Sequence, residues 1–589
     1  MKDTDFSCSA IGAAGWIVVC ASMLGCVTRL YGLDHPNTPV YDETHVGRFL
    51  NWYTERAFFF DVHPPLAKLL MLWVGTALGF QGRDSCAFDE SHAPCDMAAL
   101  RLVPALCGAA MLPVVVVTGC AMKLDIRAAI LAGWLLLIDP LWIGLSRIAL
   151  NDMVQMLFIA LTHFFALHAC SMGTHSTANA RPTSESMRVS LSIGDVAILA
   201  ATGTSLGCAL QCKYAMALTT VAWLGIQNLT FLVELIHHRC GVRTLLLQAA
   251  CRGLLLLGVP LLLHLLFFCL HLQYLPNSGN GDGYMSERFQ ATLNGSRFES
   301  LVAPDLHLGW FGKLREHAIA QLSYNRNMAI LFPQGSHQFD SRWYTWPLAW
   351  RGVYFTLTKD WTGVASSPTG RHVLGMYIQP SPVIVLLTTF AALACAIGLC
   401  YAALRLALFS LCPSRGSAAA KRCSAIPERT ASQTAISAPA SPPDTSPSSA
   451  AAPASVCAFG TTRASNRQRQ LFVHFRPGGV GSLLLAYVVH LLPYATQQRQ
   501  TFVLYYLPAY YFAILLTARV WHTAACVPWS APLRNVLIGA LCFVTGYFSF
   551  RISAIAYAAP TTVWQWNQML QDASTECWVE SGTCWATRT

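Results

Sequence analysis

The chain has 589 residues, of which 54% are hydrophobic and only 12% are charged, and its formal net charge is +10. Several apolar runs of about 20 residues indicate a polytopic membrane protein, because one helical crossing needs about 20 apolar residues. Lys and Arg lie mostly in short segments between these runs, where they set membrane topology, so the positive charge does not indicate nucleic-acid binding.

Hydropathy predicts eleven membrane spans in chain order. They are residues 11–30, 98–120, 128–145, 149–170, 192–211, 213–236, 246–273, 374–411, 479–497, 500–518 and 530–550. The apolar run at 66–80 is short for a crossing and begins with Pro64, Pro65 and Lys68, so we expect an interfacial or re-entrant helix there.

Basic residues fix the orientation of these spans. With 66–80 left out, the loops after even-numbered spans carry Lys123, Arg127, Arg181, Arg188, Arg239, Arg243, Arg519 and Arg534. The positive-inside rule makes that side cytoplasmic, with the N-terminus cytoplasmic and the C-terminus lumenal. Counting 66–80 as a span would reverse every later loop.

This topology divides the chain into regions. Residues 1–412 form a transmembrane region with lumenal loops at 31–97 and 274–373, residues 413–470 a disordered cytoplasmic linker rich in Ala, Ser and Pro, residues 471–550 the C-terminal spans, and residues 551–589 a lumenal tail. Two lumenal cysteine pairs are candidates for disulfides, Cys86 with Cys95 and Cys577 with Cys584. Asn294, in the lumenal sequon "NGS", is a candidate for N-glycosylation.

Ionisable residues at the membrane edge gather on the lumenal side. They are Asp42, Glu43, His63, Arg101, Arg147, Asp152, Lys213 and Arg499. Such residues are costly near hydrocarbon and favour a functional interpretation. A carboxylate there can serve as a general base, and Arg or Lys can hold phosphate oxygens, which together suit a transfer reaction with a lipid-linked phosphate donor.

Each residue also has a purely structural explanation. An Asp-Glu pair favours the first turn of any helix, and Asp152 can cap one. Arg101 and Lys213 can extend from a span end to the interface. His63, before two prolines, can be a packing residue. No single residue decides between the two explanations. The functional interpretation rests on the fact that all of them are predicted on the lumenal side of the membrane.

Several segments resemble one family of glycosyltransferases. "YDETHVGRFLNWYTERAFFFDVHPPLAKLL" is similar to the first lumenal loop of the protein O-mannosyltransferases, with its Asp-Glu pair and "FFDVHPPLAKLL" segment. Further similar stretches follow in order: "ALRLVPALCGAAMLPV", "SRIALNDM", "CKYAMAL", "LPNSGNGDGYMSERFQATLNG", "HQFDSRWYTWPLAWRGVYF" and "RQTFVLYYLPAYYFAI". The resemblance covers almost the whole chain except the linker and tails.

The resemblance implies an all-α polytopic enzyme of the GT-C glycosyltransferase fold in the endoplasmic reticulum membrane. Such an enzyme moves mannose from dolichyl phosphate mannose to Ser or Thr of secretory polypeptides, inverting the anomeric centre. It implies that Asp42 is the base and that Glu43 positions acceptor or sugar. Arg101 matches a family arginine at the lumenal end of the second span and is expected to bind substrate or donor. Lys213 and Arg499 match positions that suit the donor phosphate. We expect His63 and Asp152 to contribute to the same substrate site.

The expected reaction requires no metal, and the sequence shows no ligand cluster beyond His45, His63 and the carboxylates. Expected partners are the membrane, the lipid-linked donor, acceptor polypeptides and a second family member in a homo- or heterodimer. Nucleic acid is not expected to bind.

The chain departs from the family pattern in three places. Loop 274–373 has no room for the β-trefoil MIR domain of typical eukaryotic members, Leu504 and Tyr505 stand where many have two histidines, and "MYIQPSPVIV" replaces the usual "GNP". Acceptor choice is therefore open. Alternative functions are a GT-C transferase using another polyprenyl-phosphate sugar or acceptor, a non-catalytic subunit, or a transporter. The last usually has internal repeats, and none is evident here.

Overall fold

A computed structural model of the chain describes residues 8–88, 95–170, 191–237, 240–359, 372–411, 477–525 and 531–575. By its contacts the chain divides into a main unit, residues 1–395 with 474–589, and a second unit, residues 396–473. Of the second unit only the end of one helix is described, and everything below concerns the main unit. The predicted linker at 413–470 and the pair Cys577 and Cys584 lie outside the described residues.

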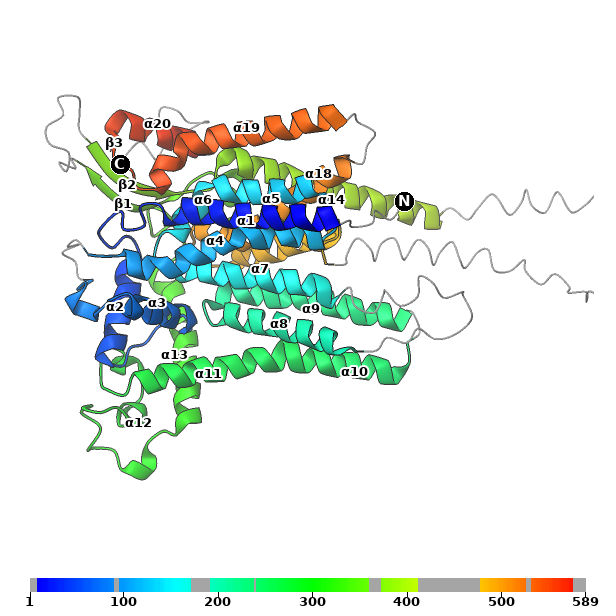
Figure 1. Cartoon of the computed structure of the whole chain (residues 1–589). Helices are drawn as coiled ribbons and strands as arrows, with labels where there is room; N and C mark the ends of the chain where they lie inside the picture. Colours follow the sequence, from blue (N-terminus) through cyan, green and yellow to red (C-terminus); the bar gives the residue numbers. More distant parts are fainter. Residues whose placement is uncertain are drawn as a thin grey trace, which may run out of the picture. The chain divides into compact units, whose positions relative to one another are not determined.

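Helices dominate the described residues (Figure 1). They are α1 (Cys8–Leu30), α2 (Glu43–Glu55), α3 (Leu66–Ala77), α4 (Ala98–Ala121), α5 (Ile126–Ile138), α6 (Pro140–Ser146), α7 (Asn151–Ala169), α8 (Ile193–Leu210), α9 (Tyr214–His237), α10 (Val242–Gly253), α11 (Val259–Tyr274), α12 (Glu287–Gln290), α13 (Trp310–Leu331), α14 (Pro382–Leu411), α17 (Val480–Leu491), α18 (Leu507–Ala525), α19 (Ala531–Ala556) and α20 (Val563–Ala573). The predicted helical class is confirmed.

Each of the eleven predicted spans coincides with an apolar helix or helix pair. Among the described residues, eight helical segments are long and apolar enough to cross a membrane, and the α5–α6 pair, bent by 61°, is a ninth. The remaining two are the shorter apolar segments Gly15–Leu30 and Val480–Thr496. The bend falls at Asp139, which caps α6 by accepting a hydrogen bond from the Leu141 amide at 3.0 Å, and Pro140 occupies the first helical position.

The run at 66–80 forms the short helix α3, and both of its ends lie at the same end of the bundle. Near its start, the Leu66 amide donates to the carbonyl of Gln211, at the end of α8. Farther along, the Trp73 indole donates to the Tyr274 hydroxyl, at the end of α11, at 3.0 Å. Twelve residues extend only about 18 Å, which is short of the ~30 Å hydrocarbon layer. Together with its contacts at one end of the bundle, this length fits the interfacial or re-entrant helix that the alternation of basic loops predicts.

A three-stranded antiparallel sheet, which sequence reasoning missed, lies near the same end. It has the order β1 (Val353–Lys359), β2 (His372–Ile378), β3 (Thr561–Thr562). The span predicted at 374–411 consequently began too early, because the apolar residues of β2 join the apolar helix without a break in hydropathy. Helix α14 starts only at Pro382.

Two arginines join helix ends by binding backbone carbonyls. Arg29, near the end of α1, donates to the carbonyls of Leu136 and Leu137 at 2.9 Å each, at the end of α5. Arg147, after α6, donates to the Gly32 carbonyl at 2.7 Å, beyond the end of α1. The last carbonyls of a helix lack intrahelical partners and carry partial negative charge, so cations stabilise them. These contacts bring the α1, α5 and α6 ends together beside the loop that leads to α2.

Candidate active site

Asp42 stands exposed at the start of α2, on a backbone held by the sheet. The preceding residue, Tyr41, has a left-handed φ of 49°, which is uncommon for a residue with a side chain. Its amide donates to the Phe355 carbonyl of β1 at 3.1 Å, and the two rings stack with centroids 4.4 Å apart. The Asp42 carboxylate makes no capping hydrogen bond to α2. The sheet thus fixes the backbone while the carboxylate stays accessible.

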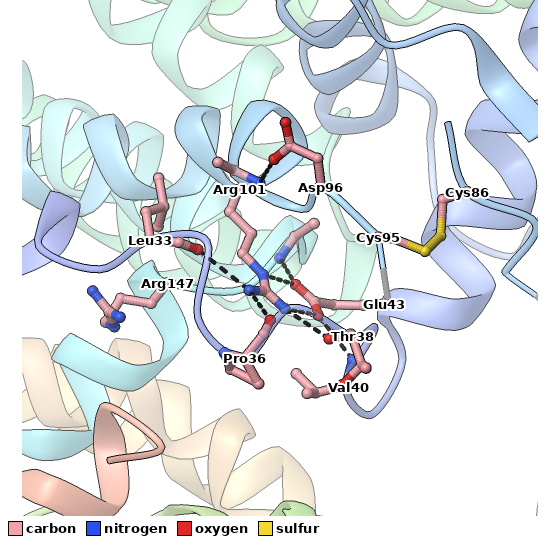
Figure 2. A network of polar contacts seen from close by, with 12 residues as sticks. Leu33, Pro36, Thr38, Val40, Glu43, Cys86, Cys95, Asp96, Arg101 and Arg147 are labelled. Atoms are coloured by element: carbon pink, nitrogen blue, oxygen red, sulfur yellow. Dashed lines mark hydrogen bonds and ion pairs between the residues drawn. A yellow bond between two sulfur atoms is a disulfide. The ribbon is translucent and has the colours of Figure 1, made fainter. Parts of the chain in front are cut away.

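Glu43, the next residue, is completely buried in an ion pair with Arg101 of α4 (Figure 2). The guanidinium donates from Nε and Nη2 to the two carboxylate oxygens at 2.8 Å each. The same oxygens accept from the Val40 amide at 2.9 Å and the Ala149 amide at 2.7 Å. The guanidinium also donates to the carbonyls of Leu33, Pro36 and Thr38.

This geometry does not match the predicted contacts of Glu43 with acceptor or sugar, or of Arg101 with substrate. Every oxygen of the Glu43 carboxylate is bonded to protein, and both side chains have 0% exposure. The pair instead ties the loop after α1, the start of α2 and the loop before α7 together. Both residues therefore hold the backbone around Asp42 in place.

Lys213 and Asp152 form an ion pair close enough to Asp42 to act electrostatically on its carboxyl group. The Lys213 ammonium lies 3.2 Å from the Asp152 carboxylate, with side-chain exposures of 12% and 5%. It also lies 5.2 Å from the ring centroid of Tyr505. An ammonium has three donors, of which this carboxylate takes one. Lys213 can therefore bind a further anion.

The segment before α3 carries His63 and is held by a buried lysine. Lys68 is paired with Asp61 and donates to the carbonyls of His63 and Pro64 at 3.0 and 3.1 Å. Burial lowers the pKa of His63 to about 4, so this ring is neutral at neutral pH. For Asp61, burial raises the pKa, but Lys68 and His63 outweigh it and leave that pKa lowered. The "DVHPPLAK" motif is thus largely a scaffold around its lysine.

The surroundings of Asp42 raise its pKa. Although the side chain is exposed to water, it sits among enough protein that desolvation is the largest effect, and it favours the neutral acid. Asp152 and Asp61 raise the pKa further, whereas His45 and Lys213 lower it. A carboxylate whose pKa is raised toward neutrality is a stronger base than an ordinary aspartate.

The other predicted residues make contacts of their own, and none of these is with Asp42, Lys213 or Asp152 among the described residues. Arg499 is half-buried and donates to the Asn325 side chain of α13 at 3.3 Å. Asn294 is exposed. Cys86 and Cys95 form a disulfide, with Cα atoms 5.4 Å apart, near the Glu43–Arg101 pair (Figure 2).

From the sequence, no role at the site is assigned to three residues, Tyr41, Tyr505 and Lys68. Tyr41 and Tyr505 carry no charge, so a search for ionisable residues passes over them. Lys68 was noted only as a residue at the start of a short apolar run. The signal that could have revealed its ion pair is its short spacing from Asp61, which lies on the loop just before the same helix.

The described residues therefore bring together an exposed carboxylate and a neighbouring cation at one end of a membrane bundle. Among them, no group of three or more His, Cys, Asp or Glu side chains could hold a metal ion. An exposed base beside a cation that can bind an anion suits group transfer from a phosphate-linked donor.

The bundle of apolar helices with its polar group at one end has the fold of the GT-C class of membrane proteins. The fold is similar to that of one chain in the solved structure of the Saccharomyces cerevisiae protein O-mannosyltransferase Pmt1-Pmt2 complex bound to the sugar donor. The superposition covers 96% of this chain and 92% of that chain. The TM-score is 0.69 at 18% identity, so this likeness concerns the fold.

Sequence comparison gives the family. Residues 19–275 match the family model of dolichyl-phosphate-mannose-protein mannosyltransferase, and residues 451–573 match that of the C-terminal four-span region of protein O-mannosyltransferase. The chain belongs to the protein O-mannosyltransferase family.

Named relatives support the same assignment over part of their length. The chain is 32% identical over 282 residues to dolichyl-phosphate-mannose-protein mannosyltransferase 4 of Candida albicans, covering 46% of this chain and 35% of the relative. It is 32% identical over 284 residues to protein O-mannosyl-transferase 1 of Mus musculus, covering 47% and 36%. The match thus spans little more than a third of each relative.

Proposed function

We propose that this chain transfers mannose from dolichyl phosphate mannose to Ser and Thr hydroxyls of secretory-pathway proteins, with inversion at the anomeric carbon. The observation that carries the proposal is the exposed carboxylate of Asp42, which makes no capping hydrogen bond to α2, near the Lys213–Asp152 pair. The names of the relatives, and the sugar donor bound to the yeast complex, support the choice of donor.

In the proposed reaction, Asp42 takes the proton of the acceptor hydroxyl as its oxygen bonds to the anomeric carbon. The bond from that carbon to the phosphate oxygen breaks, and dolichyl phosphate leaves with the electron pair. Lys213 stabilises the charge that develops on the phosphate. A single displacement from the opposite face inverts the anomeric centre. His63 and Asp152 line the same site, the former neutral and the latter holding the Lys213 ammonium.

Arg499 is proposed as a second cation for the donor at the outer margin of the site, where it lies near α13. We assign the Asp42 end to the lumen of the endoplasmic reticulum, and the disulfide at that end supports an oxidising compartment. The Pmt1-Pmt2 complex supports a dimer with another family member as the working assembly.

The test uses the purified full chain, dolichyl phosphate mannose and a Ser/Thr-rich peptide. We expect mannosylated peptide, detected by mass spectrometry, and α-linked product from the β-linked donor. Dolichyl phosphate glucose serves as the alternative donor. Transfer from dolichyl phosphate glucose alone would contradict mannose as the transferred sugar. Binding of dolichyl phosphate mannose without transfer to any peptide would favour a non-catalytic subunit.

The pH profile gives a further prediction. Asp42 acts as base only when deprotonated, so the rate should rise with pH through its raised pKa. Lys213 lowers that pKa and Asp152 raises it. Lys213→Gln should therefore move the acidic limb of the kcat profile to higher pH, and Asp152→Asn should move it to lower pH. The position of the limb is compared, because both variants also lower the maximal rate. If the acidic limb lies at the same pH in the unaltered chain and in both variants, the electrostatic coupling of Asp42 to Lys213 and Asp152 is contradicted.

A further inference from the structure

The helix that starts at Asp42 carries a continuous stripe of accessible side chains away from it. Asp42, His45, Phe49 and Trp52 are spaced three, four and three residues apart, which places them along one face of α2. Asp42 and His45 are exposed, and Phe49 and Trp52 are partly exposed. The opposite face holds the fully buried Leu50. An elongated ligand that reaches Asp42 can therefore continue along this stripe.

The stripe ends in two adjoining hollows. The first, of about 230 Å³, is lined mainly by aromatic rings, with Phe49, Trp52, Phe60, Tyr284 and Tyr324 among them. The second, of about 330 Å³, includes Arg48, Asn51 and Arg83. Trp52 and Asn280 line both hollows, so the two are direct neighbours.

The charges of these hollows favour an anionic group in the second one. Arg48 uses its Nε to donate to the Phe88 carbonyl at 2.8 Å, and its remaining guanidinium nitrogens have no hydrogen bond to a described residue. Arg83 is paired with Glu55 at 2.5 Å, with 62% of its side chain exposed. Counting the described residues alone, Arg48 therefore leaves the second hollow positive. In the first hollow, the Asp61 carboxylate is matched by Lys68.

We propose that this double hollow binds the acceptor polypeptide and selects an acidic residue at a fixed distance from the mannosylated Ser or Thr. Trp52 lies ten residues beyond Asp42, or about 15 Å along the helix. An extended peptide covers that span in about four to five residues. An apolar side chain enters the aromatic hollow while the acidic one meets Arg48. This selection rests on the proposed function, because it needs an acceptor hydroxyl at Asp42.

The experiment compares acceptor peptides that have the same charge and differ only in the position of one Glu. Each carries one Thr and one Glu, with the Glu four or five residues from the Thr on either side, or about ten residues away, and a Gln peptide serves as reference. The full chain and dolichyl phosphate mannose are used throughout. Among the peptides with Glu four or five residues from Thr, we expect one to have a KM about threefold to tenfold below that of the distant-Glu peptide, with a similar kcat. An effect of this size is what a partly exposed charge pair can give.

Variants assign the effect to the hollow. Arg48→Gln and, independently, Arg83→Gln should reduce the KM ratio between the near-Glu and distant-Glu peptides. Arg48→Glu should reverse the preference, so that a peptide with Lys at the near position in place of Glu has the lower KM. The matched control is Arg56→Gln, an exposed arginine at the end of the same helix that lines neither hollow; its ratio should equal that of the unaltered chain.

The two proposals fail in different ways. Equal KM values for all Glu positions, in a protein that does transfer mannose, would overturn the acidic selection alone. Absence of transfer to every peptide, including the Gln reference, would overturn the proposed function instead. A positional effect that persists in Arg48→Glu and in Arg83→Gln would place the selecting group elsewhere and overturn the assignment to this hollow.

Discussion

Replacement of Asp42 by Asn is expected to lower kcat by about 10²- to 10⁴-fold, the contribution typical of one general base. The amide has nearly the same shape as the carboxylate but does not accept the proton. Because the side chain is exposed and makes no capping hydrogen bond, the substitution should leave the fold intact. The measurement is single-turnover transfer of labelled mannose from saturating donor.

The control for this variant is Asp84→Asn, which removes an exposed carboxylate from the same loop without touching the site. It should transfer mannose at the unaltered rate. Donor affinity, measured separately, should change little in Asp42→Asn, because Lys213 remains in place. An unchanged kcat in Asp42→Asn would remove this residue from the mechanism and leave no exposed base beside Lys213.

Replacement of Glu43 by Gln should act on stability more than on chemistry. It leaves the Arg101 guanidinium charged, fully buried and unpaired, and removing one partner of a buried ion pair typically costs about 3–5 kcal/mol. We expect a clear loss of thermal midpoint and of folded protein in detergent. Activity should fall with the folded fraction and with the position of Asp42.

A double variant separates this role from substrate binding. Glu43→Gln combined with Arg101→Met removes the unpaired charge, so its thermal midpoint should lie above the value expected from adding the two single effects. Full recovery is not expected, because the carbonyls of Leu33, Pro36 and Thr38 lose their donor. A Glu43→Gln protein with unaltered stability and a raised acceptor KM would restore the prediction that Glu43 contacts substrate.

The spans were predictable from sequence because the bilayer imposes a length. An apolar run near 20 residues has few alternatives to a crossing helix, and the 12-residue α3 is too short for one. Helices outside the membrane carry no such signal. Helix α13 has mixed composition, and β2 merges with the apolar start of α14, so both were missed.

The site was predictable as a group of residues but not in its division of labour. Asp42 and Glu43 are adjacent and chemically alike, yet neighbouring residues at the start of a helix project about 100° apart. One therefore faces water and the other the core. Which one does so depends on Arg101, some sixty residues away, and on the amides of Val40 and Ala149, whose approach no local pattern reveals.

The loop that leads to Asp42 is fastened to the far end of the chain. His35 binds the Ala558 carbonyl through its ring at 2.9 Å, across 523 residues of sequence, and the Tyr557 hydroxyl donates to the Thr28 carbonyl at 2.8 Å. At about 5–20 residues per second, synthesis separates these partners by roughly half a minute to two minutes. The loop before Asp42 therefore gains these contacts only after residues 557 and 558 have been synthesised. A chain synthesised only to its middle therefore carries Asp42 on a loop that still lacks its contacts with residues 557 and 558, and we expect the proposed reaction to wait for them.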